Sequence, residues 1–470
     1  MSTTTRREHD FLGEMDIPGD AYWGVHSARA VDNFPISGQT VAQMPELIRA
    51  LAFVKKAAAQ TNGALGVISA VQMHAVVRAC DDLIGGALHE QFVVDVIQGG
   101  AGTSTNMNAN EVIANRALEH MGFEKGRYDQ LHPNDHVNAS QSTNDVYPTA
   151  LRVAAWFGIE GLLAAMADLR GAFEAKALEF KNVLKIGRTQ LQDAVPMTLG
   201  QEFLAFAIMI GEDEQRLREA RALITEINLG ATAIGTGINA PLGYGEMVIP
   251  LLAQASGVPV VKAENLVEAT QDTGSFVQLS GVLKRVACKL SKVCNDLRLL
   301  SSGPQAGFGD IKLPPRQAGS SIMPGKVNPV IPEVMNQVAF EVIGNDVTIT
   351  MASEAGQLQL NAFEPIMGYA IHKSVRHLTN ACRTLQVNCV EGIQANHELL
   401  AKRVAESVTL VTALNPIIGY EKAALIAKTA LASGGTIAEV AESLGIMSRA
   451  EMNALLVPEK LTQPVRLSVG

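Results

Sequence analysis

Apolar residues recur at helical spacing over five long stretches in the middle and the second half of the chain. These stretches contain no proline and cover residues 149–195, 197–240, 260–303, 333–364 and 366–415. The segment LRVAAWFGIEGLLAAMADLRGAFEAKALEF, which starts at Leu151, shows the pattern. A helix of thirty residues is about 45 Å long, and helices of that length need partners to be stable. The pattern therefore predicts a bundle of five long helices over residues 142–397.

The sequence on either side of the bundle has a different character. Residues 1–141 mix short helical patterns with loops rich in glycine and asparagine, such as GGAGTSTNMNANEV. Residues 398–470 carry short helical segments, including TIAEVAESLG and SRAEMNALL. The sequence therefore predicts a mainly α fold in three parts: an N-terminal domain (1–141), the central long-helix bundle (142–397) and a small, helical C-terminal domain (398–470).

The composition agrees with a helical core and indicates an oligomer. Hydrophobic residues make up 47% of the chain but aromatic residues only 5%, a mixture that favours helices over sheets. Only 18% of the residues are charged, which indicates that the helices bury more than one face, as in an oligomer. The formal net charge is -9 and the sequence has no basic cluster, so we expect no nucleic-acid partner.

The sequence shows no signal for secretion or membrane insertion. The N-terminal MSTTTRREHD lacks the apolar core of a signal peptide, and no uninterrupted run of about eighteen apolar residues exists. The five cysteines form no C-x-x-C pair and are odd in number, which favours free, buried thiols. We therefore expect a cytoplasmic protein without a membrane partner.

The segment GSSIMPGKVNP (residues 319–329) carries the most distinctive chemistry of the chain. Its glycines and prolines predict a loop. Ser320, Ser321, Lys326 and Asn328 supply hydroxyl, ammonium and amide donors that suit a carboxylate or a phosphate. The residue types alone leave open which serine, if deprotonated, acts as a base.

A phosphate-binding loop is the first alternative for this segment. Such a loop reads G-x-x-x-x-G-K-[ST], and its last hydroxyl binds magnesium. Here five residues separate Gly319 from Gly325, and Val327 stands in place of the metal-binding Ser or Thr. The segment therefore does not match a nucleotide-binding loop.

Three further segments place hydroxyl and amide side chains before expected helices. They contain Thr103 in GGAGTSTNMN, Ser142, Thr143 and Asn144 in NASQSTNDVYPT, and Thr189 and Gln190 in GRTQLQDAV. One interpretation is helix capping, and Thr198 followed by Gln201 matches a capping box. The other is an uncharged anion cradle made from helix N-termini and spare hydroxyls. Together with the lysine of the 319–329 loop, these segments suit a small dicarboxylate.

Taken together, the segments resemble the fumarase/aspartase superfamily. GSSIMPGKVNP matches the superfamily's signature loop, which is highly specific. The likeness covers nearly the whole chain, including FLGEMDIPGDAYWGVHSARAVDNF, DVIQGGAGTSTNMNANEV, QSTNDVYPT, GRTQLQDAVPMTLGQEF, INLGATAIGTG, CNDLRLLSSGP and MASEAGQLQLNAFEP. It implies the superfamily's fold and a homotetramer, in which the long helices merge in one core and loops from three subunits form each active site.

Within the superfamily the chain resembles the aspartate ammonia-lyases, or aspartases. It continues after the signature loop with VIPEVMNQVAFEVIGND, as aspartases do, and Gln190 stands where class II fumarases have histidine. The segment 132–135, HPND, instead resembles a secondary dicarboxylate segment of fumarases, and the role of His132 stays open. The resemblance implies reversible elimination of ammonia from L-aspartate to give fumarate. The alternatives are a class II fumarate hydratase, a lyase for another aspartate-like substrate, or a non-catalytic structural protein, as in an eye-lens relative.

The resemblance also implies a role for each candidate residue. Ser320 is the expected base, an alkoxide that removes the β-carbon proton and leaves an aci-carboxylate intermediate. The expected substrate contacts are Thr189, Lys326 and Asn328 for the α-carboxylate, Ser142, Thr143 and Ser321 for the β-carboxylate, and Thr103, Asn144 and Gln190 for the amino group. We expect no required cofactor, Mg²⁺ as an optional activator, and no resident metal site.

Overall fold

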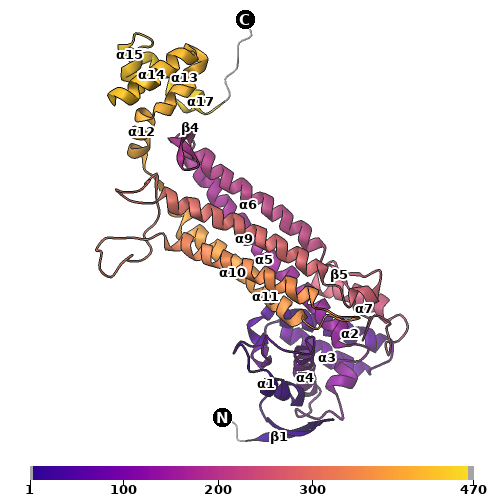
Figure 1. Ribbon diagram of the computed structural model, residues 1–470. Helices are drawn as coiled ribbons and strands as arrows, with labels where there is room; N and C mark the ends of the chain where they lie inside the picture. Colours follow the sequence, from indigo (N-terminus) through magenta and orange to yellow (C-terminus); the bar gives the residue numbers. More distant parts are fainter. Residues whose placement is uncertain (1–3, 464–470) are drawn as a thin grey trace. The chain divides into compact units, whose positions relative to one another are not determined.

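The computed structural model describes residues 4–463, and its fold is mainly helical (Figure 1). The five long helices are α5 (Thr143–Glu179), α6 (Leu199–Ala222), α9 (Gly274–Leu300), α10 (Val330–Glu354) and α11 (Glu364–Asn388). The prediction of a mainly α protein with five long helices is therefore confirmed.

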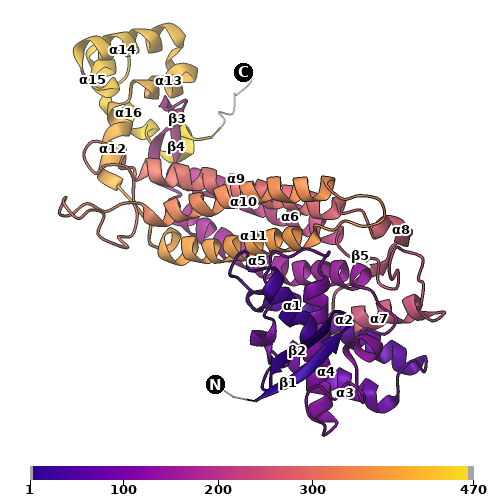
Figure 2. The same cartoon turned by 60° about the horizontal axis from the view of Figure 1, so that its bottom comes forward.

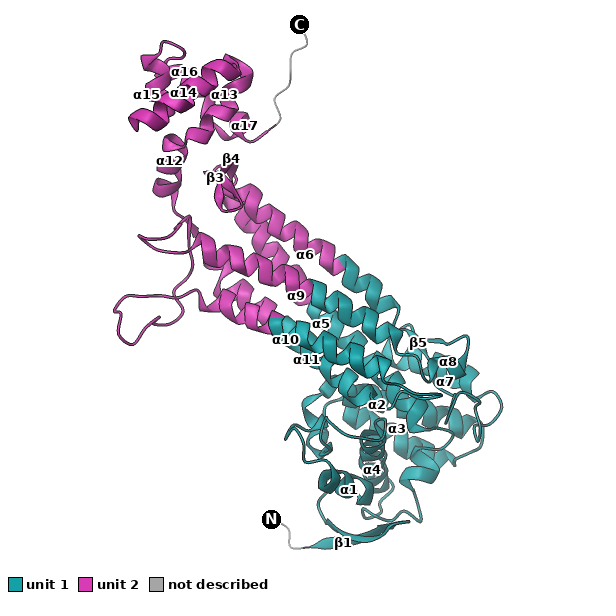
Figure 3. Cartoon of the chain, viewed as in Figure 1, with its two compact units in different colours: residues 1–163, 215–285, 340–378 teal, residues 164–214, 286–339, 379–470 magenta. Residues whose placement is uncertain are grey.

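The chain forms two compact units, and each long helix contributes residues to both (Figure 3). Unit 1 comprises Met1–Leu163, Gln215–Arg285 and Phe340–Leu378, and unit 2 comprises Ala164–Glu214, Val286–Ala339 and Thr379–Gly470. The division into three consecutive domains stays a prediction.

In unit 1, shorter helices pack around apolar side chains. The helices are α1 (Val25–Asn33), α2 (Pro45–Ala64), α3 (Ala70–Ile84), α4 (Thr103–His120), α7 (Tyr244–Ser256) and α8 (Leu266–Ala269). Ile48, Val76 and Val112, from α2, α3 and α4, are all 0% exposed. The hairpin of β1 (Thr5–Asp10) and β2 (Gly13–Pro18) lies beside α1 (Figure 2). Helix α4 also buries asparagines and a glutamate, which need hydrogen-bond partners inside the unit.

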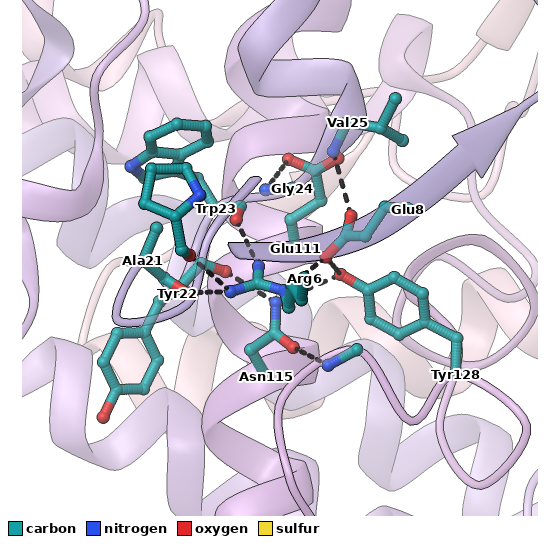
Figure 4. A network of polar contacts seen from close by, with 12 residues as sticks. Arg6, Glu8, Ala21, Tyr22, Trp23, Gly24, Val25, Glu111, Asn115 and Tyr128 are labelled. Carbon is teal, nitrogen blue, oxygen red and sulfur yellow. Dashed lines mark hydrogen bonds and ion pairs between the residues drawn. The ribbon is translucent and has the colours of Figure 1, made fainter. Parts of the chain in front are cut away.

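A buried polar network joins the β1 strand, the segment before α1 and helix α4 (Figure 4). Glu111 of α4 accepts hydrogen bonds from the backbone N–H groups of Gly24 at 2.7 Å and His26 at 2.8 Å. Burial raises the pKa of Glu111 to about 7, against these hydrogen bonds. Arg6 donates to Glu8 at 2.7 Å and to the carbonyl of Trp23 at 2.6 Å. The network therefore anchors the N-terminal segment, and none of the candidate site residues takes part in it.

In unit 2, aromatic side chains pack α5 against α6. The Phe173 ring lies 5.9 Å from that of Phe203 and 5.7 Å from that of Phe206. The C-terminal helices are α12 (His397–Glu406), α13 (Val411–Ile418), α14 (Tyr420–Ser433), α15 (Ile437–Ser443), α16 (Arg449–Leu455) and α17 (Pro458–Leu461). Leu414, Ile426 and Val440 belong to a separate small core among them. Short helices in this region agree with the sequence pattern.

Short strands also occur, which the sequence pattern did not predict. Besides β1 and β2, the described strands are β3 (Leu184–Thr189), β4 (Gln192–Thr198), β5 (Glu226–Ile227), β6 (Val261–Lys262), β7 (Ile311–Lys312) and β8 (Gln394–Ala395). They form two-stranded sheets, of which β5–β6 is parallel and the other pairs are antiparallel. β1–β2 and β3–β4 are local hairpins. The two-residue strands of β5–β6 and β7–β8 show no apolar alternation, and they pair segments that are distant in the sequence.

One long helix also resembles a membrane span in length and composition. An 18-residue window of α5 has a mean hydropathy of 1.4, and 50% of this window is buried inside the chain. A core helix of a water-soluble protein has the same properties, so α5 by itself is weak support for a membrane segment.

The five cysteines are all free thiols, as predicted. Cys80, Cys294, Cys382 and Cys389 are buried. Cys288 is exposed, so the expectation of buried thiols was wrong for this residue.

Candidate active site

The candidate residues of unit 1 lie at the starts of α4 and α5, and a buried carboxylate organises the backbone at the start of α5. Asp145 accepts hydrogen bonds from the N–H groups of Ser142 at 2.9 Å, Gly230 at 3.0 Å and Thr232 at 2.9 Å. Asp145 is 0% exposed, and burial raises its pKa to about 6. This side chain therefore ties the loop before α5 to the segment INLGATAIGTG.

Asn144 is fixed by the same segment. Its side-chain amide donates to the carbonyl of Ala233 at 2.7 Å, and its own carbonyl accepts from Asn228 at 3.0 Å. Ser142 performs a capping role, because its hydroxyl accepts from the N–H of Asn144 at 3.3 Å. The capping interpretation is therefore correct for Ser142, and it does not exclude a ligand contact.

Thr143 contacts α4 through its hydroxyl. Its Oγ1 accepts from Asn106 Nδ2 at 3.1 Å, and the residue is only 8% exposed. Thr103 is the first residue of α4; its exposed hydroxyl donates to the carbonyl of Gly100 at 2.8 Å and makes no cap bond. Capping therefore does not explain Thr103, and its exposed position remains suited to a ligand.

In unit 2, Thr189 and Gln190 lie at the tip of the β3–β4 hairpin. Both residues are exposed, and Gln190 and Leu191 have φ angles of 53° and 63°. Such left-handed turns prefer Asn or Gly, so two larger residues place strain in the tip. Strain of this kind is frequent at functional sites. The predicted turn is present, but it joins two strands. The capping box is also present, with Thr198 and Gln201 exchanging hydrogen bonds of 2.9 and 3.0 Å.

Asp310 anchors this hairpin through ion pairs. Its carboxylate lies 2.7 Å from Arg188 Nη1, 3.3 Å from Lys185 Nζ and 2.7 Å from Arg403 Nη1. Burial raises the pKa of Asp310. The hydrogen bond from Arg188 and the charge of Lys185 lower this pKa by more, so the net shift is downward. The ion cluster connects β3 and α12 with the segment that precedes the signature loop.

The signature loop is closed by its own glycine. The N–H of Gly319 donates to the carbonyl of Lys326 at 2.7 Å, and the Asn328 side chain donates to the carbonyl of Gly319 at 2.9 Å. A Cβ atom at Gly319 would lie 2.6 Å from the Lys326 oxygen, so glycine is required for this closure. The side-chain amide nitrogen of Asn328 therefore donates one of its hydrogen bonds inside the loop.

Ser320 occupies a distinct electrostatic position in the loop. Its Oγ accepts hydrogen bonds from the backbone N–H groups of Ile322 at 3.2 Å and Met323 at 3.1 Å. Two N–H donors aimed at one oxygen stabilise negative charge on that oxygen. Ser321 and Lys326 are exposed on the same loop.

The candidate residues form two groups. Unit 1 contains Thr103, Ser142, Thr143 and Asn144, and unit 2 contains Thr189, Gln190, Ser320, Ser321, Lys326 and Asn328. The structure brings Ser142 and Asn144 together, links Thr143 to α4, and holds Ser320 and Asn328 in one closed loop. The substrate contacts assigned to these residues stay predictions.

Sequence reasoning missed the residues behind the hydroxyl loop of unit 1. Lys55, Asn106 and Asn138 connect there. Asn106 and Asn138 stand in the quoted segments GGAGTSTNMN and NASQSTNDVYPT but were given no role, and the signal for Lys55 was a lysine inside the apolar run ALAFVKKAAA. His132 caps a short helical turn at Pro133–Val137, because its Nδ1 accepts from the N–H groups of Asn134 and Asp135.

Across residues 4–463, no group of three or more His, Cys, Asp or Glu side chains is arranged to bind a metal ion.

Comparison with known proteins places the chain in a family. Residues 13–344 match the family model described as lyase, and residues 410–463 match the model described as fumarase C C-terminus. The chain therefore belongs to the lyase family, in the fumarase/aspartase superfamily. The predicted resemblance is confirmed.

Individual relatives are similar over nearly the full length. Aspartate ammonia-lyase of Pseudomonas aeruginosa is 57% identical over 462 residues, covering 98% of each chain. Aspartate ammonia-lyase of Escherichia coli K12 is 52% identical, covering 99% of this chain and 97% of the relative.

Solved structures show the same fold. A fumarate lyase:delta crystallin from Brucella melitensis bound to cobalt superposes with a TM-score of 0.95 at 58% identity, covering 98% of this chain and 100% of that one. The class II fumarase from Schistosoma mansoni superposes with a TM-score of 0.91 at 34% identity, with the same coverage.

Proposed function

We propose that this protein is an aspartate ammonia-lyase, which converts L-aspartate reversibly to fumarate and ammonia. The observation that carries the proposal is the full-length similarity, at 52 to 57% identity, to relatives named for this activity. The geometry of Ser320 and the glutamine at position 190 support it.

The reaction begins with removal of a weakly acidic proton. Ser320 as an alkoxide takes the proton from the β-carbon, and the electron pair moves into the neighbouring carboxylate as an aci-carboxylate. The two backbone N–H groups on Ser320 Oγ stabilise the alkoxide before the transfer. Return of the electron pair forms the double bond and breaks the carbon–nitrogen bond, so ammonia leaves with the bonding pair.

Gln190 distinguishes loss of ammonia from loss of water. The leaving group of aspartate is already a protonated amine, so a neutral amide is sufficient to orient it. Hydroxide leaving from malate needs a proton donor, which an amide side chain does not supply. A class II fumarase is the alternative, favoured by the HPND segment at 132–135 and by the fold shared with a class II fumarase.

Fumarate absorbance separates these two functions. The protein is supplied with L-aspartate and with L-malate in separate reactions, and ammonia is measured beside fumarate. We expect equal amounts of fumarate and ammonia from aspartate and none from malate. Turnover of malate alone would show that the protein is a hydratase. No turnover of either substrate would support another aspartate-like substrate or a structural role.

A homotetramer is part of the proposal, with each site completed by loops from three subunits. Exposed apolar side chains on the long helices support an oligomer: Phe340, Val347 and Met351 of α10 are 63%, 56% and 66% exposed. Sedimentation at four times the chain mass of 50.0 kDa would agree, and a monomer would contradict it.

The remaining predictions concern cofactors and cellular location. We propose that activity needs no added cofactor and that Mg²⁺ acts at most as an activator; loss of all activity after chelation would contradict this. The cytoplasmic location also stays a prediction.

A further inference from the structure

Lys55 is buried in unit 1, directly behind the proposed carboxylate-binding loop. It lies on α2 and is 0% exposed, whereas its neighbour Lys56 reaches Asp81 at the surface with a 2.6 Å ion pair. Burial lowers the pKa of Lys55 to about 7, while the charges of Asp145 and Cys80 raise it. A buried amine is destabilising unless it is bonded, so its position calls for a reason beyond packing.

Lys55 connects to Thr143 through two asparagines. Lys55 Nζ donates to Asn138 Oδ1 at 2.8 Å. The same oxygen accepts from Asn106 Nδ2 at 3.2 Å, and Asn106 Nδ2 also donates to Thr143 Oγ1 at 3.1 Å. All four side chains belong to unit 1, and they come from α2, the loop before α5, α4 and α5.

The direction of these hydrogen bonds follows from the lysine. In its charged form Lys55 only donates, so Asn138 turns its oxygen toward it. That oxygen faces the amide nitrogens of Asn106 and Asn110, which both donate to it at 3.2 Å, and the Asn106 nitrogen also reaches Thr143. Thr143 Oγ1 then accepts from inside the protein, and its single proton stays available for an acceptor outside.

Without the ammonium group, the opposite direction becomes accessible, at the cost of the 3.3 Å hydrogen bond from Asn138 Nδ2 to the carbonyl of Gln141. Within the described residues, Asn106 Oδ1 and Asn110 Oδ1 are buried and accept no hydrogen bond. If the Asn138 amide turned its Nδ2 toward them, Asn106 could turn its oxygen toward Thr143. The Thr143 hydroxyl would then donate inward, and its proton would be lost to a ligand.

We propose that Lys55 is a positioning residue for the reaction: through Asn138 and Asn106 it leaves the Thr143 proton free to bind the β-carboxylate of the substrate. The inference rests on the proposed function, in which Thr143 binds this carboxylate. The interaction strengthens during the reaction, because the aci-carboxylate carries more charge than the substrate carboxylate.

A double-mutant cycle tests the link between the two residues. Lys55→Met removes the donor at similar length, and Thr143→Val removes the hydroxyl at similar volume. We expect Lys55→Met to lower kcat/KM for L-aspartate by about tenfold or more, the effect of one hydrogen bond to a charged group. In the Thr143→Val background the same change is expected to lower kcat/KM by less than about threefold.

Lys56→Met is the matched control, because it removes the adjacent lysine without touching Asn138. It should leave kcat/KM within about twofold of wild type, since exposed ion pairs contribute little. An unchanged kcat/KM for Lys55→Met, or the full loss in both backgrounds, would overturn the proposal. If Lys55→Met does not fold, Asn106→Leu breaks the same chain and is expected to show the same dependence on Thr143.

Succinate binding by calorimetry separates this inference from the proposed function. Succinate carries two carboxylates but no leaving group, so its affinity reports on the carboxylate contacts alone. A wild-type protein that binds succinate but forms no fumarate from aspartate would overturn the function, and weaker succinate binding by Lys55→Met would still support the link. An active wild type with equal succinate affinity in Lys55→Met would overturn the link alone.

Discussion

Gly319→Ala tests whether closure of the signature loop places the base. The added Cβ would lie 2.6 Å from the Lys326 carbonyl oxygen, and ordinary contact begins at 3.4 Å. The two segments must therefore separate by about 0.8 Å, which stretches the 2.7 Å hydrogen bond from Gly319 N–H beyond useful length. The bond from Asn328 to Gly319 weakens as well, so about 2 kcal/mol of loop closure is lost.

The expected result is a large loss of rate with little loss of stability. A displacement of this size at a reacting group lowers kcat by roughly 100-fold. The loop is exposed, so the thermal midpoint should stay within about 2 °C of wild type. The assay is the initial rate of fumarate formation at saturating L-aspartate, with thermal unfolding measured on the same preparation.

Gly171→Ala provides the matched control. Gly171 lies on α5 in the same unit, and a Cβ there would meet nothing within 4 Å. This variant should keep full activity and gain about 0.5–1 kcal/mol, because alanine is the better helix former. A Gly319→Ala protein with wild-type kcat would refute the reasoning. So would a fall in its thermal midpoint large enough to explain the lost rate by unfolding.

Three other predictions follow from single side chains. Ser320→Ala should lower kcat by about 100- to 10,000-fold while sedimentation stays unchanged; near-normal turnover would rule out Ser320 as base. Lys326→Ala should raise KM for aspartate by about 10- to 100-fold, and an unchanged KM would contradict its carboxylate role. Glu364 is 4% exposed, and burial raises its pKa to about 8, so the wild type should lose stability as pH rises from about 4.5 to 8. Glu364→Gln removes the part of this dependence that Glu364 contributes and leaves the parts from Glu111 and Asp145, and urea unfolding at several pH values measures the difference; parallel curves for both proteins would exclude a contribution from Glu364.

The helices were predictable because their signal is local. An apolar stripe repeats every three to four residues over α5, α6 and α9, and no proline interrupts it after Pro148 in the second turn of α5. The β3–β4 hairpin was not predictable, since β4 contains Pro196 and the tip uses Gln190 and Leu191 instead of the residues that favour such turns. Its position depends on Asp310, more than a hundred residues further along the chain.

The candidate site divides in the same way. By itself, the sequence determined the composition of each segment: the serines, lysine and asparagine of the signature loop and the hydroxyl runs at the starts of α4 and α5. The residues of each segment are neighbours in the chain, so the amino-acid sequence alone specifies which side chains the segment carries. The tertiary structure alone decided which donors face Ser320 Oγ, and that Lys55 connects to Thr143 through Asn138 and Asn106. Hydrogen bonds act over about 3 Å, and only folding brings residues so distant in sequence to that separation.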